Sequence, residues 1–192
     1  VEGIVWNNSQ DKILIYTKSK KVWRANTRGD YWYFDLNTGK GKQIGNGFGA
    51  STLMFAKISP DNKNIAYVVN HNIYLENIST NKITQLTKDG TDRIINGTFD
   101  WVYEEEFEFS RAFQWSPEGT YIAYYRFDET GVKEYNMTIY DNAYNKDYRY
   151  KYPKAGEANS KVEIHIYDVA NSKDVKAQHE QGDIYIPRIK WT

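Results

Sequence analysis

Three consecutive carboxylates, Glu104, Glu105 and Glu106, lie among aromatic residues in the stretch DWVYEEEFEF, residues 100–109. Like charges repel, so such a run needs a physical reason. A solvated acidic turn is one interpretation, and a site for a cation is the other. An ammonium group has three N–H donors, and two carboxylates can accept two of them in charge-assisted hydrogen bonds worth about 1.5–3 kcal/mol each. An acylated amine would leave partly buried carboxylates unpaired.

The spacing of the glutamates limits the backbone that could bring them together. Adjacent side chains diverge by about 100° on a helix and point to opposite faces of a strand. Glu105 and Glu106 therefore converge only where the chain is irregular or tilted at a helix start. We expect at most a turn or two of helix over residues 103–109, with Asp100 as a helix cap or turn former. Arg111 either pairs with the glutamates or belongs to the ordinary surface charge.

Other catalytic chemistries find little support in this chain. Glycosidases need carboxylates that face each other about 5–9.5 Å apart, which sequence neighbours rarely achieve. There is no Cys, no G-x-S-x-G motif and no phosphate-binding glycine loop. The three histidines, His71, His165 and His179, lack metal-ligand spacing, and His165 lies in an alternating run that indicates a structural role. We expect no catalytic residue, metal or cofactor here.

Composition excludes some partners and favours strands. Lys+Arg and Asp+Glu number 25 each, so the formal net charge is zero, which argues against nucleic acid or an anionic membrane as the main partner. The longest apolar runs, such as Ile65 to Val69, reach about five residues, against the roughly 20 that a membrane helix needs. The 6 Trp, 17 Tyr and 8 Phe favour β-strands. The 192 residues suffice for one domain.

An internal repeat sets the expected fold. Each copy has an apolar pair, a Ser, a turn and an apolar strand. The copies are IVWNNSQDKILIY (4–16), FAKISPDNKNIAYVV (55–69) and FQWSPEGTYIAYY (113–125). We take Ser9, Ser59 and Ser116 as equivalent anchors, and residues 189–191 resemble the start of a fourth copy. Ser-Pro followed by polar residues is turn chemistry, because proline fixes φ at the second turn position.

Short strands, turn signals and a period near 50 residues are typical of β-propeller blades. The expected strands include Tyr31 to Leu36, Asn64 to Val69, Asn72 to Leu75 and Ile83 to Leu86. A β-sandwich is the second choice, because sandwiches rarely repeat their own sequence. The predicted fold is therefore all-β: a propeller fragment of about three to four blades, with a short helical insertion that carries the glutamates.

We place the blade repeats near residues 4–50, 51–112 and 113–188. A closed propeller has at least four blades, and an unclosed array leaves unpaired strand edges. We therefore expect residues 1–192 to be part of one propeller domain that continues beyond both ends of this chain. Between the strands of the third repeat, Glu134 to Tyr152 is a long insertion rich in tyrosine. Such an insertion is either a disordered loop or an interaction arm.

The motif DWVYEEE resembles the double-glutamate motif of the dipeptidyl peptidase IV family of serine exopeptidases. Further resemblances follow in the same order along nearly the whole chain. They are SQDKILIYTKSKKVWRANTRGDYWYFDL (9–36), similar to an early blade, QWSPEGTYIAYYRFDET (114–130), similar to the strand pair after the motif, and RYKYPKAGEANSKVEIHIYDV (149–169), similar to the YPKAG segment. DWVYEEE followed by YPKAG about fifty residues later is a specific signal.

The resemblance implies a propeller that caps an α/β-hydrolase domain, which is absent from this chain. That domain would supply Ser, Asp and His to release N-terminal dipeptides ending in Pro or Ala. Matching the motif residue by residue places the pair that binds the substrate's free N-terminal ammonium at Glu105 and Glu106; Glu104 is not carried over. The family also uses an Arg against the substrate carbonyl, but the loop Asn46 to Ser51 contains none. This chain alone is expected to be inactive.

The resemblance also carries expectations about partners and location. The Tyr-rich segment Glu134 to Tyr152 would be an arm used in homodimer contact, with a self-packed hairpin as the alternative. Vertebrate members carry several disulfides, so the absence of Cys favours a periplasmic or secreted bacterial enzyme. Two other functions stay open: a non-catalytic propeller that binds proteins, and a prolyl tripeptidyl peptidase with its amine clamp placed differently.

Overall fold

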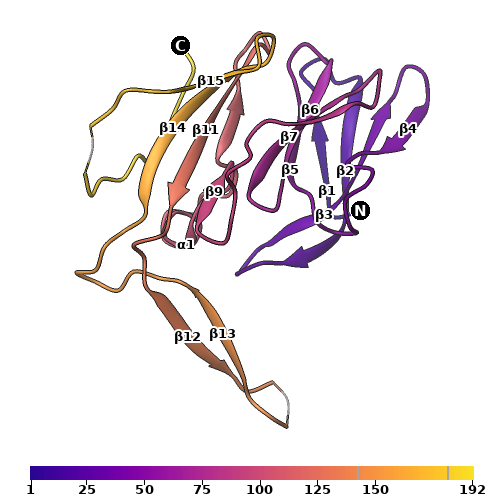
Figure 1. Cartoon of the computed structure of the whole chain (residues 1–192). Helices are drawn as coiled ribbons and strands as arrows, with labels where there is room; N and C mark the ends of the chain where they lie inside the picture. The colour runs from indigo at the N-terminus through magenta and orange to yellow at the C-terminus, as the bar shows by residue number, and fades with distance from the viewer. Residues whose placement is uncertain (142, 181) are drawn as a thin grey trace.

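The computed structural model describes residues 1–141, 143–180 and 182–192. Residue 142 of the Tyr-rich segment and residue 181 of the third repeat lie outside the described residues. Three antiparallel sheets stand side by side, and a separate hairpin projects away from them (Figure 1). The all-β prediction with one short helix is confirmed for the described part of the chain. In that part, no helix is long and apolar enough to cross a membrane.

The first two sheets are meanders in which successive strands pair antiparallel. The first consists of β1 (Gly3–Trp6), β2 (Lys12–Lys21), β3 (Asn26–Asp35) and β4 (Lys40–Gln43). The second consists of β5 (Met54–Ile58), β6 (Asn64–Val69), β7 (Asn72–Asn77) and β8 (Ile83–Gln85). The third consists of β10 (Phe113–Trp115), β11 (Tyr121–Asp128), β14 (Lys161–Asp168) and β15 (Lys173–Lys176), with β9 (Ile94–Asn96) also paired to β11. In this third sheet, β11 pairs antiparallel with β14 across the inserted hairpin. The boundaries of the blade repeats stay a prediction.

A polar side chain fixes the turn between the first two strands of each sheet. Ser59 Oγ, Ser116 Oγ and Asn7 Oδ1 each accept a hydrogen bond from the backbone N–H five residues later, at 3.0, 3.1 and 2.9 Å. The anchor in the first sheet is therefore Asn7, and the expectation of Ser9 was wrong. A carboxamide oxygen accepts such a bond as well as a hydroxyl does, so two candidates fitted the pattern.

The core lies between and beyond the sheets because side chains alternate along each strand. On β11, Ile122 and Tyr124 pack toward the second sheet. Tyr125 and Phe127 face the opposite way and pack against Tyr103 of the short helix. The two faces of the third sheet thus serve different neighbours: one face joins it to the second sheet, and the other positions the helix.

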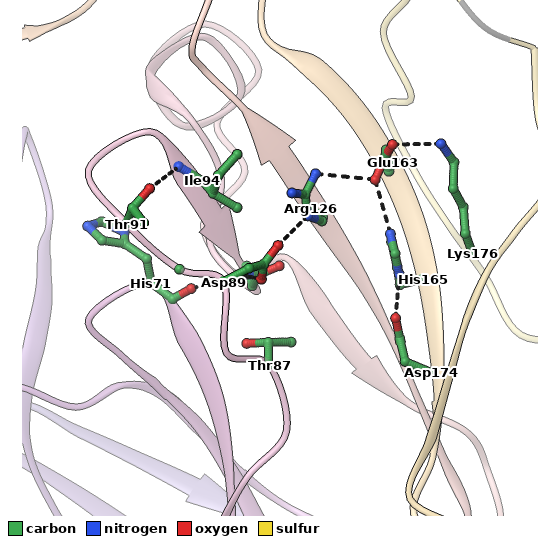
Figure 2. A network of polar contacts seen from close by, with 12 residues as sticks. His71, Thr87, Asp89, Thr91, Ile94, Arg126, Glu163, His165, Asp174 and Lys176 are labelled. Atoms are coloured by element: carbon green, nitrogen blue, oxygen red, sulfur yellow. Dashed lines mark hydrogen bonds and ion pairs between the residues drawn. The ribbon is translucent and has the colours of Figure 1, made fainter.

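A network of charged side chains lies on the face of the third sheet that meets the second (Figure 2). Arg126 contacts Asp89 through Nε at 2.8 Å and Glu163 through Nη1 at 3.3 Å. His165 lies between Asp174, 2.6 Å from Nδ1, and Glu163, 3.2 Å from Nε2. Burial works against a charged imidazole, but the hydrogen bonds to both carboxylates raise the pKa of His165. These contacts agree with the structural role that the sequence indicated.

The hairpin is built from β12 (Glu134–Ile139) and β13 (Lys146–Lys151), which pair only with each other among the described residues. It projects from the body of the molecule (Figure 1). Tyr140 and Tyr144 near its tip are 81% and 86% exposed. The described residues of the Tyr-rich segment therefore form a hairpin arm, and its role in a homodimer stays a prediction.

Candidate functional site

The glutamate run begins on a short helix, α1 (Trp101–Glu105), that Asp100 caps. The Asp100 side chain accepts a hydrogen bond from the Tyr103 backbone N–H at 3.0 Å, as an N-cap residue should. Its other oxygen accepts from the Ser160 hydroxyl at 2.6 Å. Burial raises the pKa of Asp100, and these hydrogen bonds oppose that shift. The cap ties α1 to the segment that returns from the arm.

Aromatic side chains hold α1 in place. Tyr103 is 2% exposed and stacks on Phe99 with ring centroids 5.4 Å apart. Its hydroxyl accepts a hydrogen bond from the Ile186 backbone N–H at 2.7 Å. Trp101 packs edge-on against Tyr152 at the base of the arm, with a centroid distance of 4.4 Å. Trp101 and Tyr103 are therefore packing residues.

Glu105 is the last residue of α1 and forms an ion pair with Arg24, which lies in a loop of the first sheet. Its side chain is 4% exposed and lies 2.6 Å from Nε of Arg24. The backbone N–H of Arg24 donates to its other oxygen at 3.1 Å. Arg24 belongs to the loop between β2 and β3, whose tip points toward α1 (Figure 1). The Arg24 side chain is 79% exposed, so its remaining N–H groups can reach a ligand.

Glu106 caps the end of the helix. Its backbone N–H donates to the Val102 carbonyl at 2.9 Å, and φ is −95° with ψ −35°. The two glutamates of the expected pair therefore lie at the end of a helix, not at its start. Glu105 is largely buried and Glu106 is exposed.

A cavity of about 260 Å³ lies between the helix end and the β2–β3 loop. Its lining residues are Arg24, Ala25, Glu104, Glu105, Glu108, Phe109 and Ser110. The structure thus brings Glu104 and Glu105 to one cavity and leaves Glu106 outside its lining. We call this the acidic cavity.

Glu104 makes the acidic cavity receptive to a cation. Its Oε1 is buried without a hydrogen-bond partner among the described residues. Burial, together with the charge of Glu105, raises the pKa of Glu104 to about 7. A buried carboxylate without a partner costs free energy, and a bound cation would remove that cost.

Arg24 is the residue of the candidate site that the sequence did not indicate. The resemblance places the family's arginine in the loop Asn46 to Ser51, which contains none. The guanidinium that meets Glu105 comes from a different hairpin, 81 residues earlier in the chain. The only local signal was its position in the short segment Trp23 to Ala25, between two long strands.

Two further sequence expectations concern charge. Arg111 forms no ion pair with the glutamates, or with any other carboxylate that the structure describes. Within residues 1–141, 143–180 and 182–192, no group of three His, Asp or Glu side chains could hold a metal ion. The charged groups that line the acidic cavity are three carboxylates and one guanidinium.

Known proteins share this arrangement of sequence and fold. The chain matches the family model "Dipeptidyl peptidase IV (DPP IV) N-terminal region" over residues 7–192. It is 34% identical to a probable dipeptidyl-aminopeptidase B from Podospora anserina over 98% of this chain and 22% of the relative. It is 33% identical to dipeptidyl aminopeptidase B from Saccharomyces cerevisiae over 100% of this chain and 24% of the relative.

A solved structure supports the same assignment. The crystal structure of Porphyromonas gingivalis dipeptidyl peptidase 4 matches with a TM-score of 0.88 and 34% identity, covering 96% of this chain and 26% of that one. The chain thus spans about a quarter or less of the relatives it matches. It belongs to the dipeptidyl peptidase IV family, of which it represents part of the N-terminal region.

Proposed function

We propose that this chain is the substrate-recognition and gating propeller of a serine exopeptidase that releases N-terminal Xaa-Pro or Xaa-Ala dipeptides. Glu105 and Glu106 would bind the free N-terminal amine of the peptide. One observation carries the proposal: the buried carboxylate of Glu105 is fixed by Arg24 at a cavity where Glu104 has an unpartnered oxygen. Glu106 follows directly, with an exposed side chain that can turn toward a ligand.

Each residue has a distinct task in this proposal. Arg24 holds the Glu105 carboxylate in one orientation, so an incoming ammonium meets a preorganised acceptor. Glu106 supplies the second acceptor, and the exposed guanidinium of Arg24 donates to a backbone carbonyl of the peptide. A site that anchors the N-terminal amine fixes how many residues reach the scissile bond. The nucleophile and its base belong to a hydrolase domain outside this chain.

The test compares two substrates of the full-length protein: a Gly-Pro chromogenic substrate with a free amine, and the same substrate with an acetylated amine. Rapid cleavage of the first and no cleavage of the second is expected, because acetylation removes the ammonium charge. Equal cleavage of both would refute amine recognition. Cleavage of neither would favour the non-catalytic binding protein, and release of tripeptides would favour the prolyl tripeptidyl peptidase.

We also propose that the arm forms a homodimer contact. The arm is a hairpin that projects from the body and exposes Tyr140 and Tyr144. Tyrosine is common in interfaces because it offers a large amphipathic surface at low rotamer entropy. Replacing both tyrosines by Ser should convert a dimer of the full-length protein into a monomer in analytical ultracentrifugation. A variant that sediments like the wild type would exclude these side chains from the contact.

A periplasmic or secreted location in a bacterium is the corresponding proposal for where the protein acts. The absence of Cys and the similarity to the Porphyromonas gingivalis protein support it. Similarity to fungal relatives is equally high, so the source is decided only by experiment. Fractionation of the native cells with an antibody against this chain would test it, and a purely cytosolic signal would refute it.

A further inference from the structure

A second cavity, of about 460 Å³, adjoins the acidic cavity. The two share three consecutive lining residues, Glu108, Phe109 and Ser110. A ligand that occupies one cavity can therefore extend into the other. Six residues of its wall are aromatic: Tyr31, Phe55, Phe99, Phe109, Phe113 and Tyr125. We call it the aromatic cavity.

Two guanidinium groups line the aromatic cavity without a carboxylate partner. Arg111 and Arg188 both belong to its wall, are exposed, and form no ion pair with any residue that the structure describes. Solvent reaches the Arg111 side chain, but the surrounding protein partly desolvates its guanidinium and lowers its pKa, and the Tyr31 hydroxyl opposes this shift. The charge of Arg111 in turn adds to the effect of burial in lowering the pKa of Lys57. The wall of the aromatic cavity therefore carries two guanidinium groups and one carboxylate.

Glu108 is the one acidic side chain in the wall of the aromatic cavity. It forms no ion pair with Arg111, although both residues line the same space. Its backbone has φ +59°, in the left-handed region that non-glycine residues rarely adopt. This conformation directs the chain from the helix end into the next strand, and so sets Glu108 on the wall between the two cavities.

The opposite wall is shaped by a bulge in β5. The pairing of β5 with β6 is shifted between Met54 and Lys57. Phe55, inside the bulge, has φ +57° and lines the aromatic cavity. An aromatic residue in the left-handed region costs free energy, and such bulges and strained residues are concentrated at functional sites. Strain on both walls supports a binding role for the space between them.

We infer that the aromatic cavity binds a carboxylate of the peptide whose N-terminal ammonium is held at the acidic cavity, with Arg111 as the main recognition residue. The inference rests on the proposed function, because it uses the same bound peptide. A guanidinium offers paired N–H donors that match the two oxygens of a carboxylate. An extended tripeptide spans at most about 10 Å, the scale of two adjoining cavities of this size.

The carboxylate has two sources, the C-terminus of a short peptide or an acidic side chain near the cleavage site. Gly-Pro-Gly and Gly-Pro-Gly-amide differ in the first source. Gly-Pro-Asp-amide and Gly-Pro-Asn-amide differ in the second. We would measure kcat/KM for all four peptides with the full-length wild type and with Arg111→Gln. In the variant, kcat/KM should fall about ten- to a hundredfold for the peptide that carries the recognised carboxylate.

The uncharged member of each pair provides the internal control. Its kcat/KM should stay within about threefold of wild type, which also shows that Arg111→Gln is folded. Arg111→Lys should retain part of the discrimination because it keeps the charge. Arg93→Gln removes an exposed arginine outside both cavities and should behave like wild type. An Arg111→Gln enzyme with wild-type values for both pairs would overturn the inference.

Failure of the proposed function gives a different result. If the wild type cleaves none of the four peptides, the exopeptidase assignment fails. The same pairs are then titrated into the full-length wild type and Arg111→Gln by calorimetry, which needs no turnover. Tighter binding of a carboxylate peptide that is lost in Arg111→Gln supports the inference by itself. Equal Kd values within each pair overturn it.

Discussion

The two faces of the third sheet differ in whether their charged side chains have protein partners. Toward the second sheet, Arg126 and His165 each lie between two carboxylates, and every charge has a protein partner (Figure 2). On the side of α1, Glu105 is the one glutamate lining the acidic cavity that has a protein partner among the described residues, Arg24. Glu104, Glu106 and Glu108 have none among the described residues, and neither does Arg111 of the adjoining cavity.

In the proposals above, the paired charges hold the two sheets together and the unpaired charges bind a ligand. A paired and hydrogen-bonded network fixes the relative position of two sheets. Unpartnered charges in a cavity cost stability, so a fold retains them where a ligand supplies the missing partner. Substitutions that remove paired charges should therefore lower stability, whereas substitutions that remove unpaired charges should mainly lower activity.

The largest effect is expected at the unpaired face, on activity. Glu105→Ala and Glu106→Ala should each lower kcat/KM of the full-length enzyme about a hundredfold or more, since each removes a charge-assisted bond to the amine. Unfolding should be little changed, because Glu106 is exposed and the Arg24 side chain is 79% exposed. The matched control is Glu118→Ala, in an exposed turn. Wild-type rates in both clamp variants would refute the clamp.

The paired face should respond in stability instead. Arg126→Met leaves Asp89 and Glu163 without their shared cation, and we expect a loss of about 1–2 kcal/mol. Hydrogen–deuterium exchange of β11 and β14 in the full-length protein should speed up, while kcat/KM at low temperature stays near wild type. A large loss of activity with unchanged exchange would mean that the network serves the site directly.

In contrast to Arg126→Met, Glu104→Gln should stabilise the protein at alkaline pH. The folded pKa of Glu104, about 7, lies above its ordinary value of 4.5, so ionisation is penalised in the folded state. Its contribution is most favourable below pH 4.5 and declines as pH rises through about 7. At pH 8 the variant should be more stable by about 1 kcal/mol, after allowance for solvent screening. Identical denaturation profiles for both proteins between pH 4 and 8 would contradict this.

The smallest effect concerns the pH dependence of the paired face. His165 has a raised pKa, so its stabilising contribution is complete below 6.5 and is lost as pH rises through the folded pKa. Against the effect of burial, Asp174 on β15 and Glu163 on β14 raise the pKa of His165. The other titratable or charged groups of the network are Lys176 on β15, Tyr124 and Arg126 on β11, and Asp89 in the loop after β8.

Exchange of β14 and β15 amides, corrected for intrinsic pH effects, should increase by severalfold between pH 6 and 9 in the wild type. His165→Gln should remove most of that increase, corresponding to less than about 1 kcal/mol. A variant that keeps the full wild-type pH dependence would assign the titration to another group.

Local chemistry made much of the fold predictable. The strand expected at Asn64 to Val69 is β6, because its turn and its apolar run are both contiguous in sequence. The cap at Asp100 follows from the residue before a short helix. The ion pair of Glu105 with Arg24 was not predictable, because it joins two sheets and depends on how they face each other. The position of Arg111 was not predictable either. Whether it pairs with the glutamates or belongs to the surface charge depends on how the sheets and α1 pack together.

The hydrogen bond from Ser160 to Asp100 links the arm to the acidic cavity. Ser160 ends the segment that returns from the arm, and Trp101 packs against Tyr152 at its base. Binding of a partner to the arm and binding of a peptide next to α1 would therefore be coupled through these contacts. Thermodynamic reciprocity then requires that whatever factor dimerisation adds to peptide affinity, peptide adds to dimer affinity. Substrate concentration would become a determinant of assembly.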